Sequence, residues 1–138
     1  MIKLIVGKKG SGKTKALINF SNQAVESSKG KVVCVEKGTH LIHEISSQAR
    51  LVNIEDYAVD NYTILYGFVA GILAGNYDIT DLFIDGTTRT CGNNYVEFAS
   101  IVEKISSLIA QSDVNIVFTL SCEKTELPEA LLKYIITH

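Results

Sequence analysis

The chain has 138 residues, of which 46% are hydrophobic and 20% are charged, a composition typical of a globular domain and not of a disordered segment. Its 13 Lys and Arg residues stand against 15 Asp and Glu residues, and the net charge of −2 gives no sign of a nucleic-acid-binding surface. The longest apolar run, residues 64–74, is too short to span a bilayer. We therefore expect one globular domain over residues 1–138 and no membrane span.

The predicted elements alternate between strands and helices along the chain. Short apolar runs predict buried strands at residues 2–6, 31–36, 50–54, 82–85 and 115–121. Helices are predicted at residues 15–27, 39–49 with Thr39 as cap, from Asp56 or Asp60 to about Gly75, 94–111 and 126–136. Apolar strands separated by helices are typical of a parallel sheet covered on both faces. We predict a three-layer α/β/α sandwich with a mainly parallel sheet of about five strands.

Residues 7–14, with the sequence GKKGSGKT, match the phosphate-binding P-loop pattern G-x-x-x-x-G-K-[ST]. A predicted strand precedes them and a helix follows, as the motif requires. Glycines let such a loop turn its backbone N–H groups toward phosphate, and the helix N-terminus adds further donors. We predict that Lys13 reaches the β- and γ-phosphates and that Thr14 ligates Mg²⁺. The alternative is a Gly-rich turn that matches the pattern by chance.

The predicted nucleotide-binding residues are Gly7, Lys8, Lys9, Gly10, Ser11, Gly12, Lys13, Thr14 and Lys15. Lys8 and Lys9 have no role in the pattern and are expected to raise the local positive potential.

Two acidic residues end predicted strands. Asp85 closes the apolar run LFID, the Walker B pattern of a carboxylate that holds Mg²⁺. Glu36 ends the strand after the first helix, so it is expected at the same edge of the sheet, where a carboxylate can orient a water against the γ-phosphate. We predict Lys13, Glu36 and Asp85 as catalytic residues and Thr14 and Asp85 as metal ligands. The alternatives are an Asp that only begins a turn and a Glu that is solvated or paired.

Three apolar runs after the loop resemble the core of RecA-type ATPases, a group that includes recombinases and hexameric helicases and, more distantly, PilT-like secretion motors. They are residues 32–36, 82–85 and 116–121. The resemblance implies that Glu36 is the catalytic base and that Thr119 or Ser121 senses the γ-phosphate. It also implies that the last of these strands lies between the first strand and the Asp85 strand. In the kinase–GTPase division of P-loop proteins, those two strands are direct neighbours.

We expect a purine nucleoside triphosphate, ATP with Mg²⁺, as the ligand, with slow hydrolysis to ADP and phosphate. GTP is less favoured because the chain lacks an Asn-Lys-x-Asp motif. Many extra-strand ATPases place a Glu directly after the Walker B Asp, and here Gly86 stands in that position. This favours the alternative of an interaction protein switched by nucleotide with negligible turnover. A small-molecule kinase ranks last, because Arg50 and Arg89 are the only arginines available to clamp phosphate charge.

The remaining polar and small residues have ordinary structural explanations with one functional alternative each. Arg89 lies in the polar segment 87–94, which is expected to be a mobile loop. Arg89 itself is expected to be solvated, or else to act as an arginine finger. Glycines at 67, 71 and 75 are expected to pack tightly on the sheet, or else to form a homodimer seam. Histidines at 40 and 43 are expected on a helix surface and without a metal. A further protein partner or a homo-oligomer is an alternative that the sequence does not exclude.

The three cysteines are widely spaced and odd in number, and they match neither a zinc-binding spacing nor a disulfide framework. They are Cys34, Cys91 and Cys122. The first strand runs directly into the loop, without the charged-then-apolar pattern of a signal peptide. We therefore expect reduced thiols and a cytoplasmic location.

Overall fold

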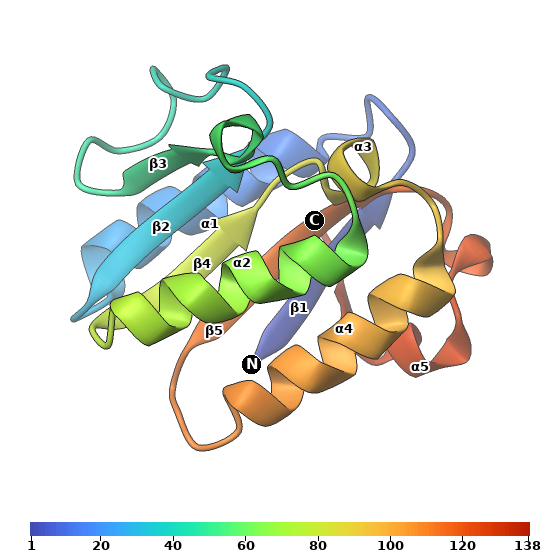
Figure 1. Cartoon of the computed structure of the whole chain (residues 1–138). Helices are drawn as coiled ribbons and strands as arrows, with labels where there is room; N and C mark the ends of the chain where they lie inside the picture. Colours follow the sequence, from blue (N-terminus) through green and yellow to red (C-terminus); the bar gives the residue numbers. More distant parts are fainter.

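Six parallel strands form the centre of the protein in a computed structural model that describes residues 1–138 (Figure 1). Their bounds are β1 (Ile2–Gly7), β2 (Lys31–Glu36), β3 (Arg50–Asn53), β4 (Ile79–Ile84), β5 (Asn115–Ser121) and β6 (Ile135–Ile136). The order across the sheet is β3-β2-β4-β5-β1-β6, and every pairing is parallel. The predicted α/β fold with a mainly parallel sheet is confirmed, with six strands in place of about five.

Strand β5 lies between β1 and β4. Ile5 of β1 is in register with Thr119 of β5, and Ile84 of β4 is in register with Phe118. Of the two orders considered above, this is the one in which the first strand and the Asp85 strand are not neighbours. Because all strands are parallel, the carboxyl ends of β1, β2, β4 and β5 meet at one edge of the sheet.

Helices cover both faces of the sheet (Figure 1). Helix α1 (Lys13–Ser27) lies on one face, and α2 (Tyr62–Gly75) and α4 (Tyr95–Leu108) lie side by side on the other. The shorter helical segments are η1 (Ile54–Tyr57), α3 (Thr87–Cys91), η2 (Lys124–Glu126) and α5 (Glu129–Leu132). No helix is both long enough and apolar enough to cross a membrane.

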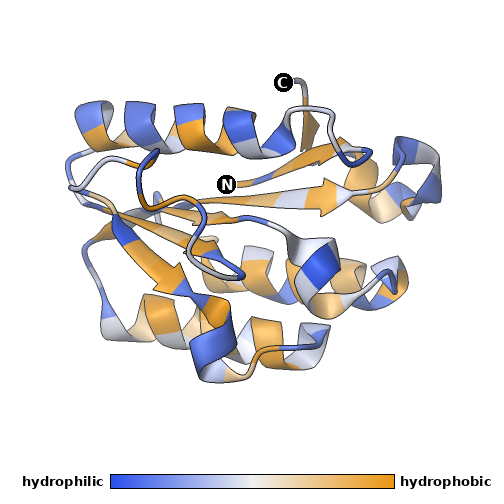
Figure 2. Cartoon of the chain, turned by 90° about the horizontal axis from the view of Figure 1, so that it is seen from above, coloured by the Kyte–Doolittle hydropathy of each residue, from blue (hydrophilic) through white to orange (hydrophobic).

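Each face of the sheet has its own apolar core. Between the sheet and α2 and α4, the rings of Tyr62, Phe98 and Phe118 pack in series with centroids 5.3 Å apart in both contacts. Between the sheet and α1, the smaller core includes Ile5 and Leu17. Figure 2 shows these hydrophobic layers on both sides of the strands. Burial on both faces explains why the strands consist of continuous apolar runs.

The helix predicted at residues 39–49 is wrong, because this segment is a series of turns. Its backbone groups are bonded to side chains of neighbouring elements. Both carboxylate oxygens of Glu36 accept backbone N–H groups at residues 40 and 41, and the Asn22 amide bonds the carbonyl of Glu44 and the N–H of Ser46. Such bonds compete with the helical pattern. His40 and His43 therefore lie on turns, where no group of three possible metal ligands forms.

The helix predicted at residues 126–136 is also wrong. Glu126 ends the short segment η2, only Glu129–Leu132 is α-helical, and the chain then forms β6 beside β1, with the N–H of Leu4 donating to the carbonyl of Tyr134. The edge of β1 supplies hydrogen-bond partners that a local pattern does not show.

Two further helices begin or end at other residues than predicted. The helix expected from Asp56 or Asp60 begins at Tyr62, where the Asn61 side chain accepts the N–H of Ile64. The helix predicted for residues 94–111 spans Tyr95–Leu108, with Asn94 as its cap. An Asn at each start satisfies an otherwise free N–H group.

Candidate functional site

The loop between β1 and α1 has a backbone that only glycine adopts readily. Gly10 and Gly12 have φ angles of 86° and 89°, in the left-handed region. At Gly7 a Cβ atom would lie 2.3 Å from the Ser11 hydroxyl oxygen, so the loop folds back onto the end of β1. Helix α1 begins directly after Gly12, and the first N–H groups of a helix have no partner within it. The loop and the helix start together can therefore hold an anion.

Lys13 is buried beneath this loop, although it carries a charge. The residue as a whole is 7% exposed, and its Nζ donates a hydrogen bond to the carbonyl of Lys8 at 2.9 Å. Burial lowers the pKa of Lys13, and the negative charge of Asp85 partly opposes this shift. A buried cation with a single protein hydrogen bond is suited to receive a negatively charged ligand.

Asp85 connects the start of α1 to the ends of β4 and β5. Its carboxylate oxygens lie 3.3 and 3.2 Å from the Thr14 hydroxyl, and Oδ1 accepts a 2.7 Å hydrogen bond from the Thr119 hydroxyl. Thr119 in turn accepts the N–H of Gly86 at 2.8 Å. The structure thus brings together Thr14 and Asp85, which were predicted as metal ligands, and adds Thr119. A threonine hydroxyl beside a carboxylate supplies the oxygen ligands that Mg²⁺ prefers.

Glu36 lies at the same edge, but its carboxylate is engaged elsewhere. It is buried, and its Oε1 and Oε2 accept the N–H groups of His40 and Leu41 at 3.0 and 2.8 Å. In this arrangement Glu36 holds the turn that follows β2. Orienting a water would require one of these oxygens to be released, so its catalytic role stays a prediction.

The segment after Asp85 is helix α3, and the prediction of a loop there is wrong. Arg89 packs over Gly86 and donates to the carbonyl of Lys37 at 3.3 Å, so it joins the ends of β4 and β2. The hydroxyl of Thr88 accepts the N–H of Ser121, which ties α3 to the end of β5. Buried Thr87 has a hydroxyl without a hydrogen-bond partner.

Charged and C-terminal residues surround the loop. Lys8 forms an ion pair of 3.0 Å with Glu123 on the loop after β5, while Lys9 and Lys15 are exposed and unpaired. The ring Nε2 of His138 lies 3.2 Å from the carbonyl of Ser11. Neither Glu123 nor His138 was predicted. Their contacts depend on the path of the chain after β5, which no local motif encodes.

The cysteines do not form a pair. All three are free, and burial raises the pKa of the Cys34 thiol to about 11 and that of Cys91 to about 12. Burial also raises the pKa of Cys122, which lies between the Lys13 region and Tyr95. Thiols with raised pKa values are poor nucleophiles near neutral pH.

Neither a scan against models of known protein families nor a search of curated proteins found a match to this chain. The site combines a loop with two left-handed glycines, a buried lysine and a hydroxyl–carboxylate pair. These groups can bind a phosphate chain and a divalent cation together.

Proposed function

We propose that the protein binds ATP with Mg²⁺ at the β1–α1 loop and hydrolyses it slowly. The observation that carries the proposal is the position of Lys13, whose buried Nζ lies against the loop carbonyl of Lys8 while the next residue, Thr14, contacts Asp85. Burying the charge of Lys13 costs free energy, and a phosphate bound in the loop would offset this cost, because its negative charge would replace the lost contact with water.

The strand order supports an ATPase core of the RecA type over the kinase–GTPase division. In the former, the strand that carries the sensing residue lies between the first strand and the Walker B strand, and β5 occupies this position. Thr119 is at the end of β5 and bonds Asp85 directly. It fits the place of a residue that responds to the γ-phosphate better than Ser121, whose N–H is bonded to Thr88.

In the proposed reaction, water attacks the γ-phosphorus in line with the bridging oxygen, and the bond to that oxygen breaks to give ADP and phosphate. Lys13 would neutralise charge on the β- and γ-phosphates. Thr14 and Asp85 would hold Mg²⁺, which supplies charge neutralisation when bound. Glu36 would orient the water if its carboxylate leaves the turn at His40 and Leu41.

A thermal-shift titration with ATP, GTP and other triphosphates, each with and without Mg²⁺, tests the binding. A ligand at ~100 times its Kd stabilises a protein by ~2.7 kcal/mol. We expect Mg²⁺–ATP to give this stabilisation in the wild type and in Lys29→Met, whose lysine is exposed and lies outside the β1–α1 loop, but not in Lys13→Met. If no triphosphate binds the folded wild-type chain, or if Lys13→Met binds as the wild type does, the proposal is refuted.

A second candidate function is a nucleotide-switched interaction protein with negligible turnover. The engaged carboxylate of Glu36 and the presence of Gly86 after Asp85 favour it, because neither leaves a free base beside the loop. Steady-state ATPase assays of Glu36→Gln separate the two. A general base contributes ~10²–10⁴-fold to a rate, so a fall of that size supports hydrolysis with Glu36 as base. Equal rates would exclude this base role.

A further inference from the structure

Helix α2 has an exposed face without charge. None of its 14 residues, YTILYGFVAGILAG, is charged, whereas α1 carries lysines and a glutamate among its 15. Ile64 on this face is 42% exposed. A surface helix normally carries charged or polar residues on its outer side, so the outer face of α2 resembles one that is covered.

The three glycines of α2 lie on this outer face. Gly67, Gly71 and Gly75 are exposed, and a Cβ atom added to any of them would meet nothing within 4 Å. The expectation that they pack tightly on the sheet is therefore wrong. None of them has a positive φ, so the fold of the single chain does not need them. Glycine inside a helix costs about 1 kcal/mol relative to alanine. A second backbone that approaches closely would use this smooth strip.

A groove runs beside the glycine strip, between α2 and the strands β2 and β3. Its volume is about 640 Å³, and it is lined on one side by Gly67, Phe68, Gly71 and Ile72 and on the other by Val33 and Val52. Tyr57 stands at one end of the groove and is 57% exposed. Strand β3 is the edge of the sheet and has only four residues.

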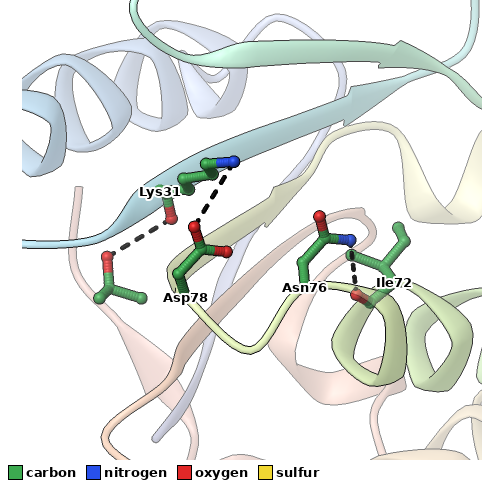
Figure 3. A network of polar contacts seen from close by, with 5 residues as sticks. Lys31, Ile72, Asn76 and Asp78 are labelled. Carbon is green, nitrogen blue, oxygen red and sulfur yellow. Dashed lines mark hydrogen bonds and ion pairs between the residues drawn. The ribbon is translucent and has the colours of Figure 1, made fainter.

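Charged residues of neighbouring segments lie at the two ends of α2, with opposite signs. Near its C-terminal end, Lys31 and Arg50 line the groove together with Asn76. Lys31 is paired with Asp78 at 3.5 Å, and the side chain of Asn76 caps the carbonyl of Ile72 (Figure 3). Arg50 is exposed and forms no ion pair.

The acidic end lies before the N-terminal end of α2. The segment from η1 to the helix start carries three exposed carboxylates, none of them in an ion pair. They are Glu55, Asp56 and Asp60. This segment is placed against α2 by Tyr57, whose ring lies 5.7 Å from that of Phe68. The unpaired charge near α2 is thus positive at one end and negative at the other.

We propose that a second copy of this chain covers this surface, with the two α2 helices antiparallel about a twofold axis. That orientation places Arg50 of each subunit beside the acidic segment of the other, and the same contact occurs twice. A parallel arrangement would bring like charges together. The strip of glycines lets the helices approach closely, and Ile64 of each subunit lies over the glycine strip and groove of the other.

The outer face of α2 is large enough for a stable dimer interface only if the groove beside it is also buried in the contact. A stable interface buries about 800 Å² on each partner, and α2 with 14 residues is ~21 Å long. The helix face alone is too small, so the contact extends over the groove to Tyr57 and to residues 47–50. The inference does not depend on nucleotide binding, because the groove lining includes none of the residues of the β1–α1 loop.

Sedimentation velocity of the full chain between about 1 μM and about 1 mM tests the dimer, a range that covers the affinity of weak and moderate complexes. We expect a concentration-dependent dimer in the wild type. Gly71→Glu should weaken dimerisation at least tenfold, because a charged side chain enters the strip while the open space leaves the fold intact. The matched control is Val96→Glu on α4, where Val96 is 74% exposed and lies outside the groove. This variant should dimerise as the wild type does.

Charge reversal tests the orientation. Arg50→Glu and Asp56→Arg should each weaken the dimer, and the double variant should recover most of the wild-type affinity. These exposed positions also keep the test valid if Gly71→Glu does not fold. A wild-type chain that is monomeric at every concentration would overturn the proposal, as would a folded Gly71→Glu with unchanged affinity. A double variant without recovery would overturn the antiparallel arrangement.

Discussion

Thr119 offers the sharpest test of how the site is held together. Its hydroxyl donates to Asp85 at 2.7 Å and accepts the N–H of Gly86 at 2.8 Å, and the residue is almost completely buried. Thr119→Val keeps the shape and removes both bonds. A lost hydrogen bond to a charged group costs about 1.5–3 kcal/mol, and an unsatisfied buried N–H costs about 1–3 kcal/mol. We expect the free energy of unfolding to fall by about 3–5 kcal/mol.

Urea unfolding followed by circular dichroism measures this change. A loss of this size lowers the Tm of a domain of this length by roughly 10 °C. Thr119→Ser keeps the hydroxyl and removes one methyl group, so it should cost only about 1 kcal/mol. Thr63→Val, at an exposed position on α2, should change stability by less than about 0.5 kcal/mol. If Thr119→Val is as stable as Thr119→Ser, the hydroxyl does not hold Asp85 and Gly86 together.

Three further predictions concern the loop, the thiol of Cys34 and the turn after β2. Gly12→Ala should lower the free energy of unfolding by about 1–2 kcal/mol, because Gly12 has a φ of 89°. Gly67→Ala, in the open face of α2, should raise the free energy of unfolding by up to about 1 kcal/mol. Equal effects of the two variants in urea unfolding would contradict the loop geometry. The pKa of Cys34 is raised by burial to about 11 from 9.0, so the stabilisation present below pH 9 should be lost as the pH rises from about 9 to about 11, by at most about 2–3 kcal/mol. Unfolding curves of Cys34→Ala over this range should fall less steeply than those of the wild type, and parallel curves would refute the assignment. Glu36→Gln should lose about 1–3 kcal/mol, because an amide leaves one N–H of the turn without an acceptor; a variant with wild-type stability would mean that the carboxylate is not bound to the turn in solution.

Local sequence patterns were enough to place the elements whose hydrogen bonds and apolar contacts repeat over a few residues. The apolar runs that became β1, β2 and β5 could be placed within about one residue, because both faces of these strands are buried. The β1–α1 loop could also be predicted, since Gly10 and Gly12 have the left-handed backbone that a loop of this pattern needs. Asp85 could be located because it follows directly after the buried run of β4.

Contacts between residues far apart in the chain follow from the order of the strands in the sheet. Thr14 and Asp85 are separated by 71 residues and Asp85 and Thr119 by 34, and the parallel order with β5 in the middle brings them together. Residues 39–49 and β6 take their hydrogen bonds from Glu36, Asn22 and the edge of β1, against local helical preference. The glycines of α2 look like packing residues in sequence, and only the folded chain shows them exposed. The periodicity of apolar residues in a sequence indicates contacts within one helix or strand. The contacts of Asp85, of residues 39–49 and of β6 depend instead on which elements the strand order places together.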